Sequence, residues 1–297
     1  MRINIGGFGH SGNTAVLDFI SEFSNTFPVG HNYSESSIVR STWGFSGIIA
    51  NSQERGGEVH PESLRALLLG DMSYYDRYEG KKPVKDDFVR NRRIRTYLGE
   101  VYEKLVDGIV ESYGCFLNKK NMEEFSSSYN FFIDQVCDLA RVKSGCLDGY
   151  CVFRNDPAAS GLHLLKYINY DYQIVSIRDP IDTAAEWLPF YGNKIDENGV
   201  EKFCKQYIQK VDKFFSVIDS IDGSVLIIDF NELVLSSSIR QKIKDRLCLV
   251  DVDAYKSFNP SESVKNIGIG KVIPETYASL ISDKCLGKFK KLQGYAL

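Results

Sequence analysis

The chain has 297 residues, of which 43% are hydrophobic, 12% aromatic and 25% charged. This is the composition of a globular protein with a substantial core, and it excludes a disordered chain, a collagen and a coiled coil. The 36 basic and 39 acidic residues leave a formal net charge of −3, so the chain as a whole gives no reason to expect non-specific binding to nucleic acid or to an anionic membrane. We expect one elaborated domain over residues 1–297.

We expect neither a secretory signal nor a membrane segment. Its start, MRINIGGFGHSG, lacks a basic stretch followed by an apolar core and a cleavage site. The most apolar stretches, such as residues 225–230, are far shorter than the roughly 20 residues that cross a bilayer. Seven cysteines form an odd set without a CxxC pair, which favours reduced thiols over disulfides or zinc ligands. We therefore expect a cytoplasmic protein.

The first elements in chain order are a strand, a turn and a helix. Residues 2–8 are an apolar run that ends in glycines, and apolar residues then recur at helical spacing over 15–23. A second strand is expected at 27–30, followed by a loop with short elements at 32–57, which is rich in Ser, Gly and Asn. Residues 61–141 have helical periodicity, and we expect them to form an insertion or cap.

Strands and helices alternate again from residue 150. Strands are expected at 150–153, 173–177 and 224–228, and helices at 159–167, from near 181, at 200–218 and from 274. Strands that alternate with helices predict a three-layer α/β sandwich, with a mostly parallel sheet covered by helices on both faces.

The turn after the first strand is rich in glycine. It reads GGFGHSGNT over residues 6–14, and in this place backbone N–H groups and the positive end of a helix can hold a phosphate. Gly7 and Gly12 have the spacing of a Walker A loop and Thr14 fits its last position, but Asn13 stands where that loop has lysine. The sequence therefore predicts a P-loop-like turn and disfavours an ordinary nucleotide kinase.

Five segments, in order, resemble those of sulfotransferases. Residues 8–15, FGHSGNTA, resemble the family's 5′-phosphosulfate loop YPKSGTTW. VFRNDPAASGLHLL (152–165) resembles VLKTHLP, and IVSIRDPIDTAAEW (174–187) resembles IYVVRDPRDVAVSW. VLIIDFNELV (225–234) resembles VLVLRYEDLV, and KNIGIG (265–270) resembles RKGxxGDW. No segment within 32–141 takes part in the resemblance.

This resemblance implies a five-stranded parallel sheet and transfer of a sulfuryl group from 3′-phosphoadenosine 5′-phosphosulfate to a hydroxyl of a carbohydrate or another small acceptor. Such a transfer depends on in-line positioning and charge stabilisation, and no metal is expected. His10 would donate to the bridging oxygen and Arg178 would bind the 3′-phosphate, unless Arg178 instead forms an ion pair with Asp179 or Asp182. The donor-binding residues implied are Gly9, His10, Ser11, Gly12, Asn13, Thr14, Arg154, Arg178 and Lys265.

Three positions depart from the family's pattern. His10 replaces a lysine or arginine of the loop, and Glu186 replaces the serine expected eight residues after Arg178. A glutamate that pointed inward would repel a 3′-phosphate, so either Glu186 turns away or the donor lacks that phosphate. The closing segment lacks its arginine, which leaves Lys265 as a phosphate contact or as a surface charge.

The acceptor hydroxyl needs a general base. Asp156 is the first candidate because it falls near the family's histidine, although an Asp beside a proline also caps helices. Glu35 is the rival and His31 the third candidate. Aromatic rings that could stack on a sugar are Trp43, Trp187 and Tyr191.

Two other functions stay open. The first is a P-loop kinase or related phosphotransferase, in which Asp229, at the end of an apolar strand, would bind magnesium. The second is a catalytically degenerate nucleotide-binding protein, in which His10 and Glu186 replace residues that the chemistry requires.

Overall fold

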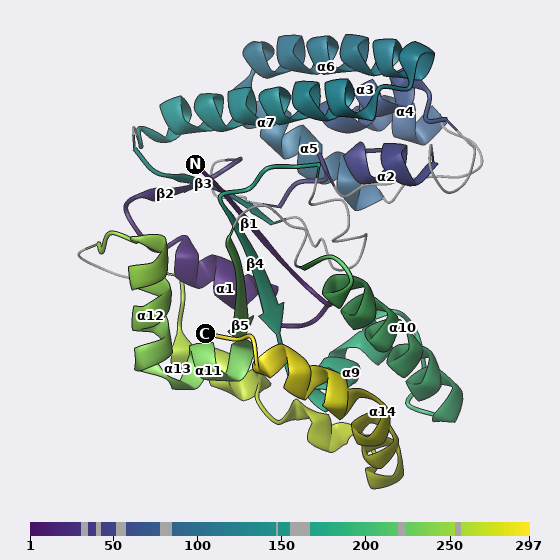
Figure 1. Ribbon diagram of the computed structural model, residues 1–297, viewed down its shortest axis with the longest axis vertical. Helices are drawn as coiled ribbons and strands as arrows, with labels where there is room; N and C mark the ends of the chain where they lie inside the picture. The colour runs from purple at the N-terminus through teal and green to yellow at the C-terminus, as the bar shows by residue number, and fades with distance from the viewer. Residues whose placement is uncertain are drawn as a thin grey trace. The chain divides into compact units, whose positions relative to one another are not determined.

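In the computed structural model, the chain forms an α/β fold in which helices flank a five-stranded, parallel sheet (Figure 1). The strand order is β2-β3-β1-β4-β5, with β1 at Arg2–Gly7, β2 at Thr26–Pro28, β3 at Tyr150–Arg154, β4 at Tyr172–Ile177 and β5 at Ser224–Asp229. This confirms the predicted α/β class and parallel sheet. The structure describes all residues except 31–34, 40–42, 52–57, 78–84, 147, 155–166, 219–223 and 253–256.

The chain divides into two compact units, and β1 contributes to both of them. The first unit consists of Met1–Asn4, Asn25–Asn155 and Leu164–Asp171. The second unit consists of Ile5–Ser24, Asp156–His163 and Tyr172–Leu297. The glycine-rich turn therefore belongs to the second unit.

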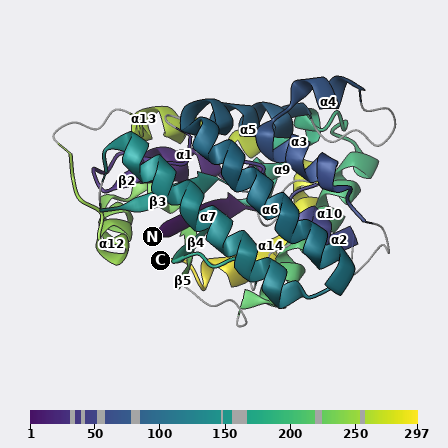
Figure 2. The same ribbon diagram turned by 90° about the horizontal axis from the view of Figure 1, so that it is seen from above.

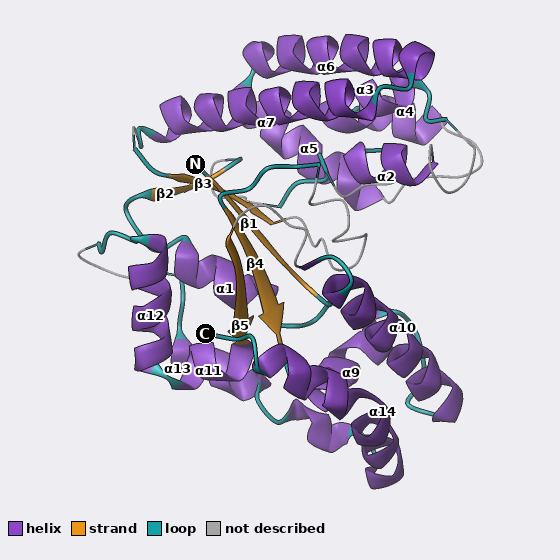
Figure 3. Cartoon of the chain, viewed as in Figure 1, coloured by secondary structure: helices purple, strands orange, loops and turns teal. Residues whose placement is uncertain are grey.

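Helices dominate the first unit (Figure 3). They are α2 (Phe45–Ala50), α3 (Pro61–Leu69), α4 (Met72–Arg77), α5 (Lys85–Leu98), α6 (Glu100–Lys119) and α7 (Met122–Ser144). The two longest, α6 and α7, lie side by side (Figure 2), and α7 also packs on β2 and β3. The described part of 61–141 is thus largely helical, as its periodicity predicts, and α2 is a short element within the predicted loop.

Two buried tyrosines on α6 donate hydrogen bonds to backbone carbonyls of neighbouring segments. The Tyr102 hydroxyl donates to the Leu68 carbonyl at 2.9 Å, and the Tyr113 hydroxyl donates to the Val59 carbonyl at 2.6 Å. Both side chains are at most 1% exposed. A phenol can fill such a site because its hydrogen bond offsets the loss of water.

The other helices of the described chain belong to the second unit. They are α1 (Asn13–Ile20), α9 (Pro180–Phe190), α10 (Glu197–Phe215), α11 (Phe230–Leu235), α12 (Ser237–Leu247), α13 (Pro260–Ser263) and α14 (Glu275–Gln293), with 3₁₀ turns η4 (Val264–Asn266) and η5 (Ile269–Val272). Both α1 and α14 pack against β4, and α14 also packs against α9 and α10. Five of the six residues of β4 are buried, as expected for a strand covered on both faces.

Local sequence explains where α9 begins. The Asp179 side chain accepts the N–H groups of Ile181 and Asp182 at 2.8 and 3.3 Å, and Pro180 occupies the first turn. Aspartate at the cap and proline in the first turn both favour a helix start. The predicted start near residue 181 is confirmed, whereas the helix predicted at 159–167 falls almost wholly outside the described residues.

Each helix in the described ranges is too short or too polar to cross a membrane. The cysteines there are all free, and four of the seven are buried. The free thiols agree with the expectation of reduced cysteines, and the buried ones act as small core residues.

Candidate functional site

The glycine-rich turn between β1 and α1 has backbone angles that most residues avoid. Gly9, His10 and Gly12 have φ values of 85°, 54° and 89°. A Cβ added at Gly12 would lie 2.4 Å from the Phe230 ring, and one added at Gly7 would lie 2.2 Å from the Ser11 hydroxyl. Close packing therefore requires glycine at 7 and 12, and the left-handed backbone adds to the requirement at 12.

A buried polar network ties this turn to β4. The Ser11 and Ser176 hydroxyls lie 3.1 Å apart, and Ser176 also donates to the Asn13 side-chain oxygen. Ser11 is 2% exposed and Asn13 7%. The resemblance implies that Ser11 and Asn13 bind the sulfonucleotide. Hydrogen bonds from their side chains to a phosphosulfate would compete with this network, so the backbone N–H groups of these residues are the better donors.

The start of α1 offers backbone donors at the carboxyl ends of β1 and β4. In the described chain no side chain caps this start, and its first turn holds no acidic residue. The first N–H groups of a helix have no acceptor within the helix and carry partial positive charge, which suits an anion. Thr14 is exposed in this first turn, so a ligand could reach its hydroxyl. Ligands of open α/β sheets commonly bind at this edge.

Arg178 follows β4, and its side chain is buried against the glycine-rich turn. Its guanidinium donates to the carbonyls of His10, at 3.3 Å, and Asn266, and it lies 5.1 Å from the centre of the Phe230 ring. Its side chain is 2% exposed and meets the Glu186 carboxylate at 3.0 Å. The ion-pair partner is therefore Glu186, and not Asp179 or Asp182 as the sequence suggested.

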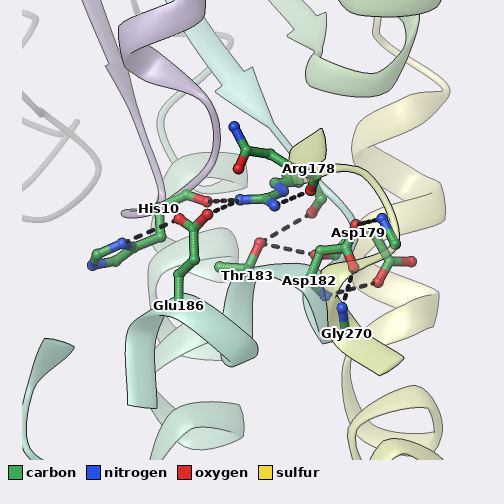
Figure 4. A network of polar contacts seen from close by, with 9 residues as sticks. His10, Arg178, Asp179, Asp182, Thr183, Glu186 and Gly270 are labelled. Carbon is green, nitrogen blue, oxygen red and sulfur yellow. Dashed lines mark hydrogen bonds and ion pairs between the residues drawn. The ribbon is translucent and has the colours of Figure 1, made fainter. Parts of the chain in front are cut away.

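Glu186 lies between two basic side chains (Figure 4). One carboxylate oxygen contacts Arg178 and the other lies 3.5 Å from His10 Nδ1. Burial by itself raises the pKa of the Glu186 carboxyl, but hydrogen bonds from His10 and Arg178, with their charges, outweigh burial and hold this pKa below its ordinary value of 4.5. Glu186 thus points toward Arg178, the case in which it would repel a 3′-phosphate.

His10 is the partly exposed partner of Glu186. Its side chain is 19% exposed, and its contact with Glu186 is an ion pair only when the imidazole is protonated. The ring centres of Phe190 and Tyr191 lie 4.7 and 6.0 Å from that of His10. These two aromatic residues are 69% and 56% exposed, so His10 is bordered by an accessible aromatic pair.

The closing segment 265–270 also reaches Arg178. Asp182 accepts the N–H groups of Gly268 and Gly270 at 2.8 and 2.7 Å, and Arg178 donates to Asn266. The structure thus brings the third and fifth similar segments together. Lys265 itself is 67% exposed and pairs with Glu262 at 2.6 Å, so it occupies the surface position that the sequence left as its alternative.

The other predicted site residues that are described lie in the first unit. Glu35 and Arg154 form a β-bridge, and the Glu35 carboxylate lies 3.9 Å from Arg154 Nη1 and 3.3 Å from Arg90 Nε. Both oxygens of Glu35 are therefore engaged by arginines. The candidate bases Asp156 and His31 lie outside the described residues.

Lys210 is a residue at the turn that sequence reasoning missed. It lies on α10, and its ammonium donates to the Phe8 carbonyl at 3.1 Å. Tyr207, Val211 and Phe214 form the buried face of the same helix. A lysine placed directly beside such an apolar face is the signal that could have identified it.

Asp229, the magnesium ligand of the kinase alternative, caps α11. It accepts the Asn231 N–H and the Gln293 side-chain amide, each at 2.9 Å. Among the described residues no group of three or more His, Cys, Asp or Glu side chains is arranged to hold a metal ion.

Comparison with known proteins finds no family model and no curated protein that matches this chain.

Proposed function

We propose that this protein transfers a sulfuryl group from 3′-phosphoadenosine 5′-phosphosulfate to a hydroxyl of a carbohydrate or another small acceptor. The observation that carries the proposal is the left-handed, glycine-rich turn that leads from β1 into the uncapped start of α1, within the described chain. Such a turn suits a phosphate or a sulfate. The ordered resemblance to sulfotransferases, with Asn13 in place of a Walker lysine, favours sulfuryl transfer over ATP-dependent phosphoryl transfer.

The site contains a group suited to the leaving oxygen. In the transfer, the bond from sulfur to the 5′-phosphate oxygen breaks while the acceptor oxygen bonds to sulfur, so negative charge grows on the 5′-phosphate. His10 Nδ1 faces Glu186, which leaves Nε2 as the nitrogen to donate a proton or hydrogen bond to that oxygen. The acceptor proton would pass to Asp156, with Glu35 and His31 as the other candidate bases.

The Arg178–Glu186 pair favours a second donor, adenosine 5′-phosphosulfate. The resemblance assigns Arg178 to a 3′-phosphate, but Glu186 lies 3.0 Å from this guanidinium and compensates its charge. A further dianion beside that carboxylate would be repelled. A donor without a 3′-phosphate needs no movement of Glu186, whereas 3′-phosphoadenosine 5′-phosphosulfate requires it to turn away.

The aromatic pair beside His10 supports a sugar as acceptor. Phe190 and Tyr191 are both more than half exposed, and aromatic faces and edges suit the apolar surface of a sugar ring. Trp43 and Trp187 are at most 7% exposed, so of the three rings considered from the sequence only Tyr191 is accessible.

A turnover assay tests the proposal. The protein is incubated with each phosphosulfate donor, labelled with ³⁵S, and with a panel of sugars and phenols, in the presence of a metal chelator. We expect labelled product to form, and we expect the His10→Asn variant to lose about 10²-fold or more of the rate. Asparagine is chosen because it tolerates the positive φ of residue 10. A parallel assay without the chelator uses magnesium–ATP, and formation of ADP there would support the kinase instead. Binding without turnover would support the degenerate protein.

A further inference from the structure

The glycines of the turn differ in which atoms lie beside them. A Cβ added at Gly7 would collide with atoms of Ser11, Asn13 and Ser176. One added at Gly12 would collide with the Phe230 side chain. At Gly9, by contrast, Lys210 Nζ is the single atom within 4 Å of that position in the described chain, at 3.6 Å. Among the described residues, the space beside Gly9 is therefore bordered by the Lys210 ammonium group.

Packing between α10 and the turn fixes this lysine. The Phe8 ring lies 6.2 Å from the ring of Tyr207 and 5.8 Å from that of Phe214, centre to centre. Tyr207 precedes Lys210 by three residues and Phe214 follows it by four, so all three share one side of the helix. Because these two rings hold Phe8, Lys210 comes next to the Phe8 carbonyl, to which it donates at 3.1 Å.

The Glu186 carboxylate offsets part of the positive charge at the turn. Arg178 and His10 both contact Glu186, so these three groups together carry a charge of zero, or of +1 when His10 is protonated. Asn13, in the position of a Walker lysine, is neutral and bonded to Ser176. A dianionic phosphosulfate or pyrophosphate needs more positive charge than this to bind tightly.

We infer that Lys210 supplies the cation of this anion site and contacts the charged oxygens of the phosphosulfate held at the turn. The inference rests on the proposed function, since it takes the turn to be the place where the nucleotide's anionic end binds. The lysine that a Walker loop carries within its own sequence would here come from α10, nearly 200 positions further along the chain. One N–H of the ammonium group donates to the Phe8 carbonyl, which places the charge at the turn.

Calorimetric titration of four proteins tests this role. The proteins are the wild type, Lys210→Gln, Lys210→Arg and the control Lys213→Gln, which changes an exposed lysine on the same helix. The probes are 3′-phosphoadenosine 5′-phosphate, adenosine 5′-phosphosulfate and inorganic pyrophosphate. We expect Lys210→Gln to weaken binding about tenfold or more, Lys210→Arg to retain most of it, and Lys213→Gln to stay within about twofold.

The outcomes separate the two proposals. Binding by Lys210→Gln equal to that of the wild type overturns the role of Lys210 and leaves the proposed function standing. Lys210-dependent binding of pyrophosphate without binding of either nucleotide supports Lys210 and overturns the proposed function. No binding of any probe by the wild type overturns both.

A second measurement uses the wild type alone, in case Lys210→Gln does not fold. Acetylation of lysines by an amine-reactive ester is followed by mass spectrometry, with and without pyrophosphate. We expect pyrophosphate to slow acetylation of Lys210 and not that of Lys213. Equal rates at Lys210 with and without pyrophosphate would overturn the inference.

Discussion

Two glycines of the turn share a left-handed backbone but meet different neighbours. Gly9 has φ 85° and Gly12 has φ 89°, yet a Cβ at Gly12 would overlap the Phe230 ring at 2.4 Å, whereas at Gly9 it would lie 3.6 Å from Lys210 Nζ. Alanine at Gly9 should cost only the backbone strain, about 1–2 kcal/mol of unfolding free energy. Alanine at Gly12 adds overpacking, for a total of about 2–5 kcal/mol. Urea denaturation of both variants checks this, and equal losses would contradict the packing described at Phe230.

Glu186 offers a test that depends on pH. The pKa of its carboxyl is lowered in the folded protein by His10 and Arg178, against the effect of burial. A carboxyl whose pKa is lower in the folded than in the unfolded protein stabilises the fold at a pH above its pKa in the unfolded protein. This stabilisation is lost as the pH falls through its pKa in the folded protein. Glu186→Gln should therefore cost about 1–2 kcal/mol near pH 6, discounted because the side chain is 36% exposed. The cost should shrink as the pH is lowered to about 3.5.

Denaturation of the wild type and the variant across this pH range measures that cost. Glu201→Gln is the matched control, because Glu201 pairs with Lys284 on the surface at 3.2 Å and should contribute less than about 0.5 kcal/mol. A cost for Glu186→Gln that stays constant with pH would show that Glu186 is not held as a carboxylate between His10 and Arg178.

At the scale of elements, Asp182 on α9 is hydrogen-bonded to the closing segment 265–270. Its carboxylate is 4% exposed and accepts the N–H groups of Gly268 and Gly270. Asp182→Ala should destabilise the protein by about 2–4 kcal/mol, because two hydrogen bonds to a charged group are lost. Hydrogen exchange should quicken at Gly268 and Gly270 and stay unchanged in β5. The control Asp283→Ala, at an exposed position of α14, should change stability by less than about 0.5 kcal/mol.

Much of the order of elements could be predicted because many elements are recorded in local periodicity and in cap residues. The apolar run of β1, the glycines after it and the Asp179-Pro180 start of α9 all act within a few positions. Helix α12 was missed although Ile239, Ile243 and Leu247 recur every four residues, since the rest of that helix is polar. The strand order β2-β3-β1-β4-β5 depends on pairing between distant segments, which periodicity does not carry.

The candidate site shows the same division between local and distant information. The turn was identified because Gly6 to Thr14 are contiguous. The partners of Arg178 and the contact of Lys210 with Phe8 join segments far apart in the chain, so neither could be deduced from spacing. Glu186 was recognised as an unusual residue, but its pairing with His10 as well as Arg178 needed the structure.

At the scale of the whole molecule, the net charge of −3 contrasts with the basic groups gathered at one turn. A chain that is weakly acidic overall attracts an anionic nucleotide only through such a local group. We therefore expect nucleotide binding to weaken with added salt, since part of the interaction is electrostatic.

Calorimetric titration of the protein with 3′-phosphoadenosine 5′-phosphate, in a buffer that contains a metal chelator, tests the central claim most directly. It needs no acceptor. It is repeated with adenosine 5′-phosphosulfate in the same buffer, and with magnesium–ATP in a buffer without the chelator. We predict one site per chain for a sulfonucleotide or its product, with a dissociation constant of about 1–100 µM and no need for a divalent metal. Binding of magnesium–ATP alone, or no binding of either sulfonucleotide probe at about 1 mM, would contradict it.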